Sequence, residues 1–138
     1  MRQHIEVPGE WASISTLLAF TDSLEACEVL SHEQCYLLRL VIEEIATNIV
    51  KYGYIEQPPG PIQVTCEYHA SRLAITIRDR GRPFDPRDHP LPDFTSATAE
   101  RSIGGLGLYF VCEMADDVHY HHDPTSGWNE LIVTKAST

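Results

Sequence analysis

One segment of the chain, residues 37–54, restricts the possible folds more than any other. Its apolar residues recur at spacings of three and four, which predicts a helix with one broad buried face. Glu44, Asn48 and Lys51 lie together at one edge of that face, each about one helical turn from the next. A solvated helix face does not require an acid, an amide and an amine aligned beside the core. We interpret the three residues as part of a ligand site.

The composition excludes several classes of protein. With 138 residues, 43% hydrophobic and 22% charged, the sequence predicts one soluble globular domain over residues 1–138. The net charge of −10 argues against direct nucleic-acid binding, which requires clustered Lys and Arg. No apolar run approaches the ~20 residues that span a bilayer, and the polar start does not resemble a signal peptide. These features predict a cytoplasmic protein that does not bind a membrane.

Two groups of residues raise the question of metal binding. The four cysteines form no Cys-x-x-Cys pair, so we interpret them as small buried residues in a reducing compartment. A disulfide or a zinc site is the alternative. His119 and His121 share one face of a predicted strand, as metal ligands would, but no third ligand is evident. We interpret them as outward-facing polar residues.

Alternating and helical patterns predict the order of elements along the chain. Strands are predicted over residues 2–7, 62–68, 73–78, 118–121 and 131–135, and helices over residues 10–30, 31–52 and 106–114. Ser31 and Gln34 have the spacing of a capping box, which predicts that the second helix begins there. This order predicts an α/β two-layer sandwich, in which helices cover one face of a mixed, mostly antiparallel sheet.

A long segment without periodicity, about residues 82–103, separates two glycine motifs. It contains four prolines, and a connection of this length inside a compact domain is usually a functional lid. Before it, Asp79 ends a predicted strand, where its carboxylate can accept a hydrogen bond from an exocyclic amine. Gly81 follows and allows a flat ring to approach the backbone. An ordinary turn is the alternative interpretation of this motif.

The second glycine motif, Gly104-Gly105-Leu106-Gly107, opens the third predicted helix. Backbone N–H groups at a helix start, together with the helix dipole, favour binding of a phosphate. Flexible attachment of the lid is the alternative. Neither glycine motif is specific by itself, and the information lies in the order and spacing of all three elements.

These elements together resemble a known family. Glu44-x-x-x-Asn48, Asp79-x-Gly81-x-Pro83-Phe84 and Gly105-x-Gly107 are similar to the N box and the two glycine boxes of the GHKL ATP-binding superfamily. Within it, the Gly-x-Pro-Phe form in a short domain resembles the anti-sigma factor serine/threonine kinases. The resemblance covers about residues 7–135 and implies the Bergerat ATP-binding fold, with ATP and Mg²⁺ as cofactors. No segment matches a Walker A loop.

The resemblance implies a role for each matching residue. Asn48 holds Mg²⁺ through its side-chain oxygen, Glu44 is the general base toward an acceptor hydroxyl, and Lys51 pairs with a phosphate. Asp79 reads the adenine amino group, while Gly81 and Pro83 shape the adenine slot. Gly105 and Gly107 supply amides that face the phosphates, with Gly104 and Leu106 in the same nucleotide-binding loop.

Two further residues have competing interpretations. Arg101, at the end of the lid, either neutralises charge on the γ-phosphate in the transition state or is a solvated lid residue. Glu43 competes with Glu44 for the role of base. Helical geometry turns Glu43 away from Asn48 by more than a right angle, so we predict that Glu43 faces solvent.

The predicted function is therefore an ATP-dependent protein serine/threonine kinase of the anti-sigma factor type. The resemblance implies a small STAS-type anti-sigma antagonist as the phosphorylated protein, a sigma factor as a second partner, and a homodimer. A nucleotide-dependent partner-binding switch without catalysis is the alternative, although the presence of both Glu44 and Asn48 favours catalysis. A histidine-kinase-like catalytic domain is a further alternative, which the Gly-x-Pro-Phe form disfavours.

Overall fold

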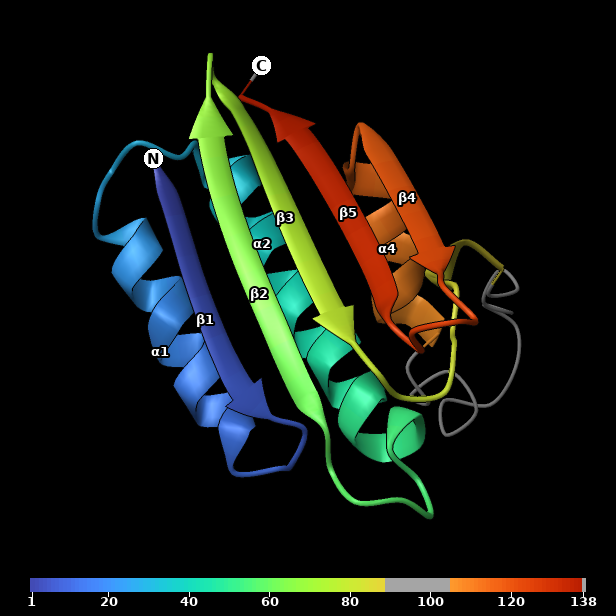
Figure 1. The fold of residues 1–138 in the computed structure, drawn as a ribbon. Helices are drawn as coiled ribbons and strands as arrows, with labels where there is room; N and C mark the ends of the chain where they lie inside the picture. Colours follow the sequence, from blue (N-terminus) through green and yellow to red (C-terminus); the bar gives the residue numbers. More distant parts are fainter. Residues whose placement is uncertain (89–104, 138) are drawn as a thin grey trace.

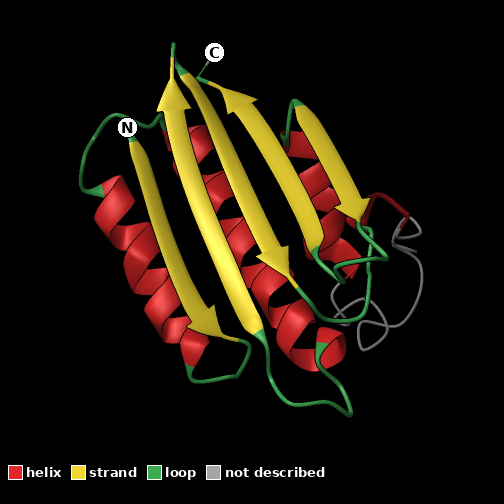
Figure 2. Cartoon of the chain, in the orientation of Figure 1, coloured by secondary structure: helices red, strands yellow, loops and turns green. Residues whose placement is uncertain are grey.

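The computed structural model describes residues 1–88 and 105–137, which form a five-stranded sheet with three α-helices on one face (Figures 1 and 2). The strands are β1 (Arg2–Pro8), β2 (Pro61–His69), β3 (Arg72–Asp79), β4 (Asp117–His122) and β5 (Asn129–Ala136). The helices are α1 (Ser13–Glu25), α2 (His32–Asn48) and α4 (Gly105–Met114). The predicted α/β sandwich is thus confirmed.

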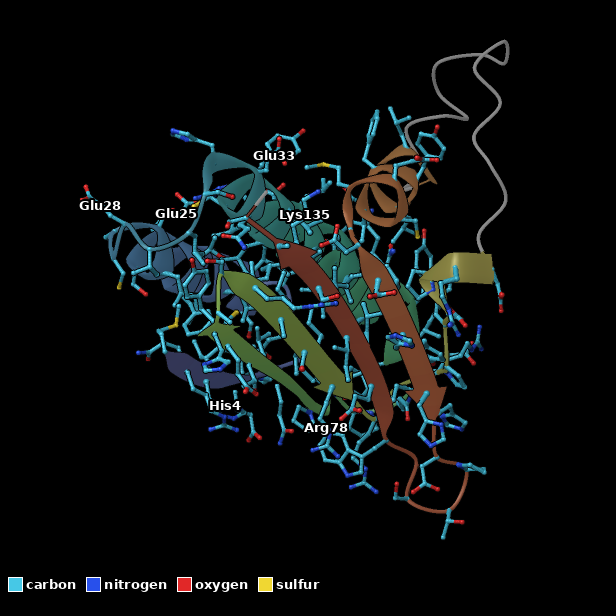
Figure 3. All side chains as sticks on the ribbon, turned by 90° about the horizontal axis from the view of Figure 1, so that it is seen from above. His4, Glu25, Glu28, Glu33, Arg78 and Lys135 are labelled. Carbon is cyan, nitrogen blue, oxygen red and sulfur yellow. The ribbon has the colours of Figure 1, made fainter. Side chains whose placement is uncertain are left out.

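The strands lie in the order β1-β2-β3-β5-β4, and each of these neighbours pairs antiparallel. The predicted sheet was mixed and mostly antiparallel, whereas the described strands contain no parallel pair. Helix α2 lies between α1 and α4 against the sheet (Figure 1). Within residues 1–88 and 105–137 no helix covers the other face of the sheet, and the side chains of His4 and Arg78 lie on that side (Figure 3). No helix in the described ranges is long and apolar enough to cross a membrane.

Helix α2 begins where the capping box predicts. Ser31 Oγ accepts a hydrogen bond from the backbone N–H of Gln34 at 3.1 Å, and Gln34 Oε1 accepts one from the N–H of Ser31 at 2.9 Å. The fully buried Gln34 side chain also donates to the carbonyls of Ser71 at 3.1 Å and Lys135 at 2.8 Å. The predicted apolar face is buried throughout, and it consists of Leu37, Leu38, Val41, Ile42, Ile45 and Ile49.

The end of this helix differs from the prediction. Helix α2 stops at Asn48, and Ile49–Gly53 form a π-helical turn, a rare conformation that often occurs at functional sites. The carbonyl of Gly53 accepts a hydrogen bond from the N–H of Arg82 at 2.6 Å. This bond brings the loop after β3 against the end of α2.

Helix α1 is shorter than predicted at both ends. It begins at Ser13, whose hydroxyl donates to the carbonyl of Pro8 at 2.6 Å. After its last residue the chain turns, and Glu28 has a φ of 59°, a left-handed conformation that a right-handed helix does not contain.

The predicted burial of the cysteines is only partly confirmed, whereas the predicted exposure of the two histidines is confirmed. The prediction of buried cysteines holds for Cys66 and is wrong for Cys27 and Cys112, which are exposed because they lie in the turn after α1 and on the outer side of α4. All four thiols are free. His119 and His121 are exposed on β4, as predicted for outward-facing residues.

Candidate functional site

A cavity of about 330 Å³ opens between the end of α2, the loop after β3 and the inner sides of β4 and β5. Most of its wall is apolar, and polar side chains reach it at only a few points. The apolar wall is formed chiefly by Ile45, Ile49, Ile77, Pro83, Phe84 and Leu131. A mostly apolar cavity with a few convergent polar groups is the usual form of a small-molecule site.

Asp79 is the carboxylate of this cavity. It ends β3 and is only 7% exposed. Its Oδ2 accepts hydrogen bonds from the N–H of Gly81 at 2.9 Å and from Nδ2 of Asn129 at 3.2 Å, while no described residue donates to Oδ1. Burial raises the pKa of Asp79, and the two hydrogen bonds oppose that rise. Asp79 can therefore offer one carboxylate oxygen to an amine inside the cavity.

Gly81 makes the close approach that shapes one side of this cavity. A Cβ at this position would lie 2.6 Å from both the carbonyl carbon and the carbonyl oxygen of Gly53. Both partners are backbone, so a side chain would push the loop after β3 away from the π-helical turn. The next residues of that loop, Arg82, Pro83 and Phe84, line the cavity.

Asn129 contributes to the site, and the sequence reasoning missed it. It is the first residue of β5, is 2% exposed and lies opposite Asp79 in the β3–β5 pairing. Its Nδ2 donates to Asp79 and, at 2.9 Å, to the carbonyl of Gly81. The available signal was the alternation of β5, which places Asn129 on the same side as the apolar Leu131 and Val133.

A second hollow, a groove of about 600 Å³, lies on the other side of Asn48. We call it the α1–α4 groove. Helix α1 supplies Ile14 and Leu18, and α4 supplies Leu106, Gly107 and Phe110. Helix α2 contributes Glu43, Glu44, Thr47 and Asn48, and the π-helical turn after it contributes Lys51. Asn48 lines both the cavity and the groove, whereas Glu44 and Lys51 line the groove alone.

Glu44 lies half-buried in the groove against the start of α4. A Cβ on Gly107 would lie 2.0 Å from the carboxyl carbon of Glu44 and 2.3 Å from its Oε1, so any side chain at this position would displace the carboxylate. Burial raises the pKa of Glu44, the charge of Glu43 raises it further, and Lys51 lowers it. A carboxylate with a raised pKa is a stronger base than an exposed one.

The prediction that Glu43 faces solvent is wrong. Glu43 is half-buried and lines the same groove as Glu44. Helical geometry separates the two side chains around α2, but both line the groove, together with Ile14 and Leu18 of α1. The groove therefore contains two carboxylates instead of one.

Lys51 is exposed at the end of the groove, within the π-helical turn. Its Nζ lies 5.9 Å from the centre of the Trp11 ring, a cation–π distance. The charge of this ammonium group lowers the pKa of Glu44.

The remaining predicted residues lie at the start of α4 or before it. Gly105 is the first residue of α4. Arg101, Gly104 and residues 89–103 of the predicted lid lie outside the described residues. The described beginning of that segment contains a short turn of 3₁₀ helix, Pro86–Asp88.

The two-layer fold thus carries an apolar cavity with a buried carboxylate, and Asn48 joins this cavity to the groove that contains Glu44. A family model described as "Histidine kinase-like ATPase domain" matches residues 7–135, and the chain belongs to this family. The match confirms the resemblance to the GHKL superfamily.

Curated relatives carry a more specific name. The Serine-protein kinase RsbW of Listeria innocua is 31% identical over 97 residues, which are 67% of this chain and 62% of the relative. The Serine-protein kinase RsbW of Bacillus cereus is 31% identical over 90 residues, covering 62% of this chain and 56% of the relative. The matched part thus spans about three-fifths of these relatives.

A solved structure shows the same fold at much lower sequence identity. The Acinetobacter baumannii histidine kinase AdeS is 12% identical, with a TM-score of 0.52 over 97% of this chain and 68% of that one. At this identity the likeness concerns the fold alone.

Proposed function

We propose that this chain is an ATP-dependent protein serine/threonine kinase of the anti-sigma factor type, built as one GHKL-type domain over residues 1–138. One observation carries the proposal: Asn48 lines both the cavity that contains Asp79 and the groove that contains Glu44. A nucleotide whose base occupies the cavity then directs its phosphates past Asn48 toward Glu44. The name of the curated relatives supports the same reading.

The residues present fit a nucleotide with Mg²⁺. Oδ1 of Asp79 accepts a hydrogen bond from the adenine amino group, and Gly81 and Pro83 hold the base in its slot. The side-chain oxygen of Asn48 is a ligand of the kind that hard cations prefer, and Lys51 pairs with a phosphate. When bound, Mg²⁺ would neutralise charge on the phosphates.

The start of α4 forms the other side of the proposed phosphate site. The helix begins at Gly105, and backbone N–H groups at a helix start favour an anion. We assign phosphate contacts to the amides of Gly105 and Gly107, with Gly104 and Leu106 in the same loop. We assign a charge-neutralising contact with the γ-phosphate to Arg101.

Glu44 then acts as the general base. Its carboxylate removes the proton of a serine or threonine hydroxyl as that oxygen bonds to the γ-phosphorus, and the bond from phosphorus to the ADP oxygen breaks. The acceptor must approach opposite the leaving ADP, which places it in the α1–α4 groove. The raised pKa of Glu44 suits a group that takes up a proton.

The partners belong to the same proposal. The hydroxyl comes from a small STAS-type antagonist, and the chain also sequesters a sigma factor and forms a homodimer. Phosphorylation of the antagonist then decides which partner is bound. The protein would act in the cytoplasm.

The test is transfer of labelled γ-phosphate from Mg²⁺–ATP to a purified STAS-type protein from the same genome. We expect stoichiometric label on one serine or threonine, no transfer by Glu44→Gln, and nucleotide binding by both proteins. Glu113 is an exposed acid on α4 that does not line the groove. Glu113→Gln is therefore the matched control for Glu44→Gln. Tight nucleotide binding without transfer to any such protein would favour the partner-binding switch.

A further inference from the structure

We propose that Asn129 is a positioning residue that holds the Asp79 carboxylate for adenine, and that Tyr120 and His122 hold Asn129 in the orientation this requires. The proposal rests on the nucleotide-binding part of the proposed function. It concerns a relay of hydrogen bonds across β3, β5 and β4, at the end of the sheet beside the cavity.

The strand register brings these side chains into one row. Asp79 of β3 lies opposite Asn129 of β5, and Asn129 lies opposite His122 of β4. Side chains of directly opposite residues point to the same face of a sheet, so all three point toward the helices. Tyr120, two residues before His122, points the same way and lines the cavity.

All four hydrogen-bonding positions of the Asn129 carboxamide are used. Nδ2 donates to Oδ2 of Asp79 at 3.2 Å and to the carbonyl of Gly81 at 2.9 Å. Oδ1 accepts from the hydroxyl of Tyr120 at 3.1 Å and from Nδ1 of His122 at 2.7 Å. A buried amide with every position satisfied is held far more firmly than one with a single bond.

The chemistry of the partners fixes the direction of these bonds. Asp79 and the Gly81 carbonyl are acceptors, so the amide nitrogen must face them; the flipped amide would place two acceptors against an oxygen. The Tyr120 hydroxyl accepts from the N–H of Phe84 at 2.9 Å and donates to Oδ1 of Asn129, because an amide oxygen can only accept. Burial raises the pKa of Tyr120, so the phenol keeps its proton at neutral pH.

The relay has a consequence for base recognition. Asn129 and the N–H of Gly81 both donate to Oδ2 of Asp79, which fixes the plane of the carboxylate and leaves Oδ1 for the ligand. An oxygen held in one place can select a base with an exocyclic amine there. A carboxylate free to rotate would distinguish such a base less well.

The experiment compares ADP with inosine diphosphate, in which an oxygen replaces the exocyclic amine. Titration calorimetry gives both affinities for the wild type, Asn129→Leu and Asp79→Asn. We expect Asn129→Leu to weaken ADP binding by about 10- to 100-fold, the range for a lost hydrogen bond to a charged group, and to leave the binding of inosine diphosphate nearly unchanged. In the Asp79→Asn background, Asn129→Leu should change the ADP affinity far less.

A purely structural role would weaken the binding of both nucleotides equally, so the ratio of the two affinities is the decisive quantity. Tyr120→Phe removes the hydroxyl but keeps the ring, and it should also lower the preference for ADP over inosine diphosphate. This variant replaces Asn129→Leu in the comparison if Asn129→Leu does not fold. Glu130 is the next residue of β5, and its side chain lies on the opposite face of the sheet. Glu130→Gln is therefore the control, and we expect it to keep the wild-type preference for ADP over inosine diphosphate.

Two results would overturn the inference. If the wild type prefers ADP and both Asn129→Leu and Tyr120→Phe keep its ratio, the relay does not position Asp79, while the proposed function stands. If the wild type binds neither nucleotide, the nucleotide-binding part of the proposed function fails and the inference fails with it.

Discussion

Replacing Gly107 by alanine provides a test of the base assignment that leaves every carboxylate in place. The new Cβ would lie 2.0 Å from the carboxyl carbon of Glu44 and 2.5 Å from its Cγ. Ordinary carbon contacts lie at about 3.5 Å or beyond, so the carboxyl group must retreat by roughly 1.5 Å. The clash falls on the far end of a flexible side chain, which can move at little cost to the fold.

This displacement separates catalysis from stability. A misplacement of about 1 Å can cost ~100-fold in rate, so we expect transfer to the acceptor protein to fall by at least that factor. Alanine is favoured over glycine within a helix by about 0.5–1 kcal/mol, so the Tm should change by no more than about 5 °C. ADP affinity should stay within about threefold, because the backbone amide is retained.

The assay is single-turnover transfer of labelled phosphate at saturating ATP, with thermal unfolding and ADP titration on the same preparations. Glu113→Ala, on the exposed side of α4, is the matched control and should transfer at the wild-type rate. In the Glu44→Gln background, Gly107→Ala should add no further loss, because its effect acts through the displaced carboxylate. Wild-type transfer by Gly107→Ala would refute the assignment of Glu44 as base in this position.

Three further changes test other parts of the structure. Glu43→Gln removes a negative charge that raises the pKa of Glu44, so the acid limb of the transfer rate should move to lower pH; an unmoved limb would contradict Glu44 as the titrating base. Gly81→Ala places a Cβ 2.6 Å from backbone atoms of Gly53, so the free energy of unfolding in urea should fall by about 1–3 kcal/mol and ADP binding should weaken; wild-type stability would mean that the loop yields freely. Ser31→Ala should lower the free energy of unfolding by about 0.5–2 kcal/mol through loss of the helix cap, with ADP affinity unchanged in calorimetry.

The sequence predicted most of α2 because its information is local. A helical period set the buried face, and a capping box set the first turn, which the structure reproduces. The spacing of Glu44 and Asn48 placed both side chains in one groove. The end of the helix was missed because a π-helical turn depends on what packs there, here the loop after β3 hydrogen-bonded to Gly53.

Asn129 and Glu43 were missed for a different reason. The contact between Asn129 and Asp79 joins residues 50 positions apart and depends on β5 lying beside β3, which no local pattern specifies. The burial of Glu43 depends on where α1 lies across the face of α2. In both cases the decisive neighbour comes from another element, so alternation and periodicity describe the residue without its surroundings.

The buried Gln34 makes the formation of α2 depend on the opposite end of the chain. Its Nε2 donates to the carbonyl of Lys135, 101 positions away, and to the carbonyl of Ser71 in the β2–β3 turn. The first turn of α2 therefore gains these two bonds only after the hairpin and the last strand are in place. We expect amide protons at the start of α2 to exchange with solvent together with those of β5, in one cooperative unit. Removing the last few residues would then loosen the helix that carries Glu44 and Asn48, although neither residue lies near the chain end.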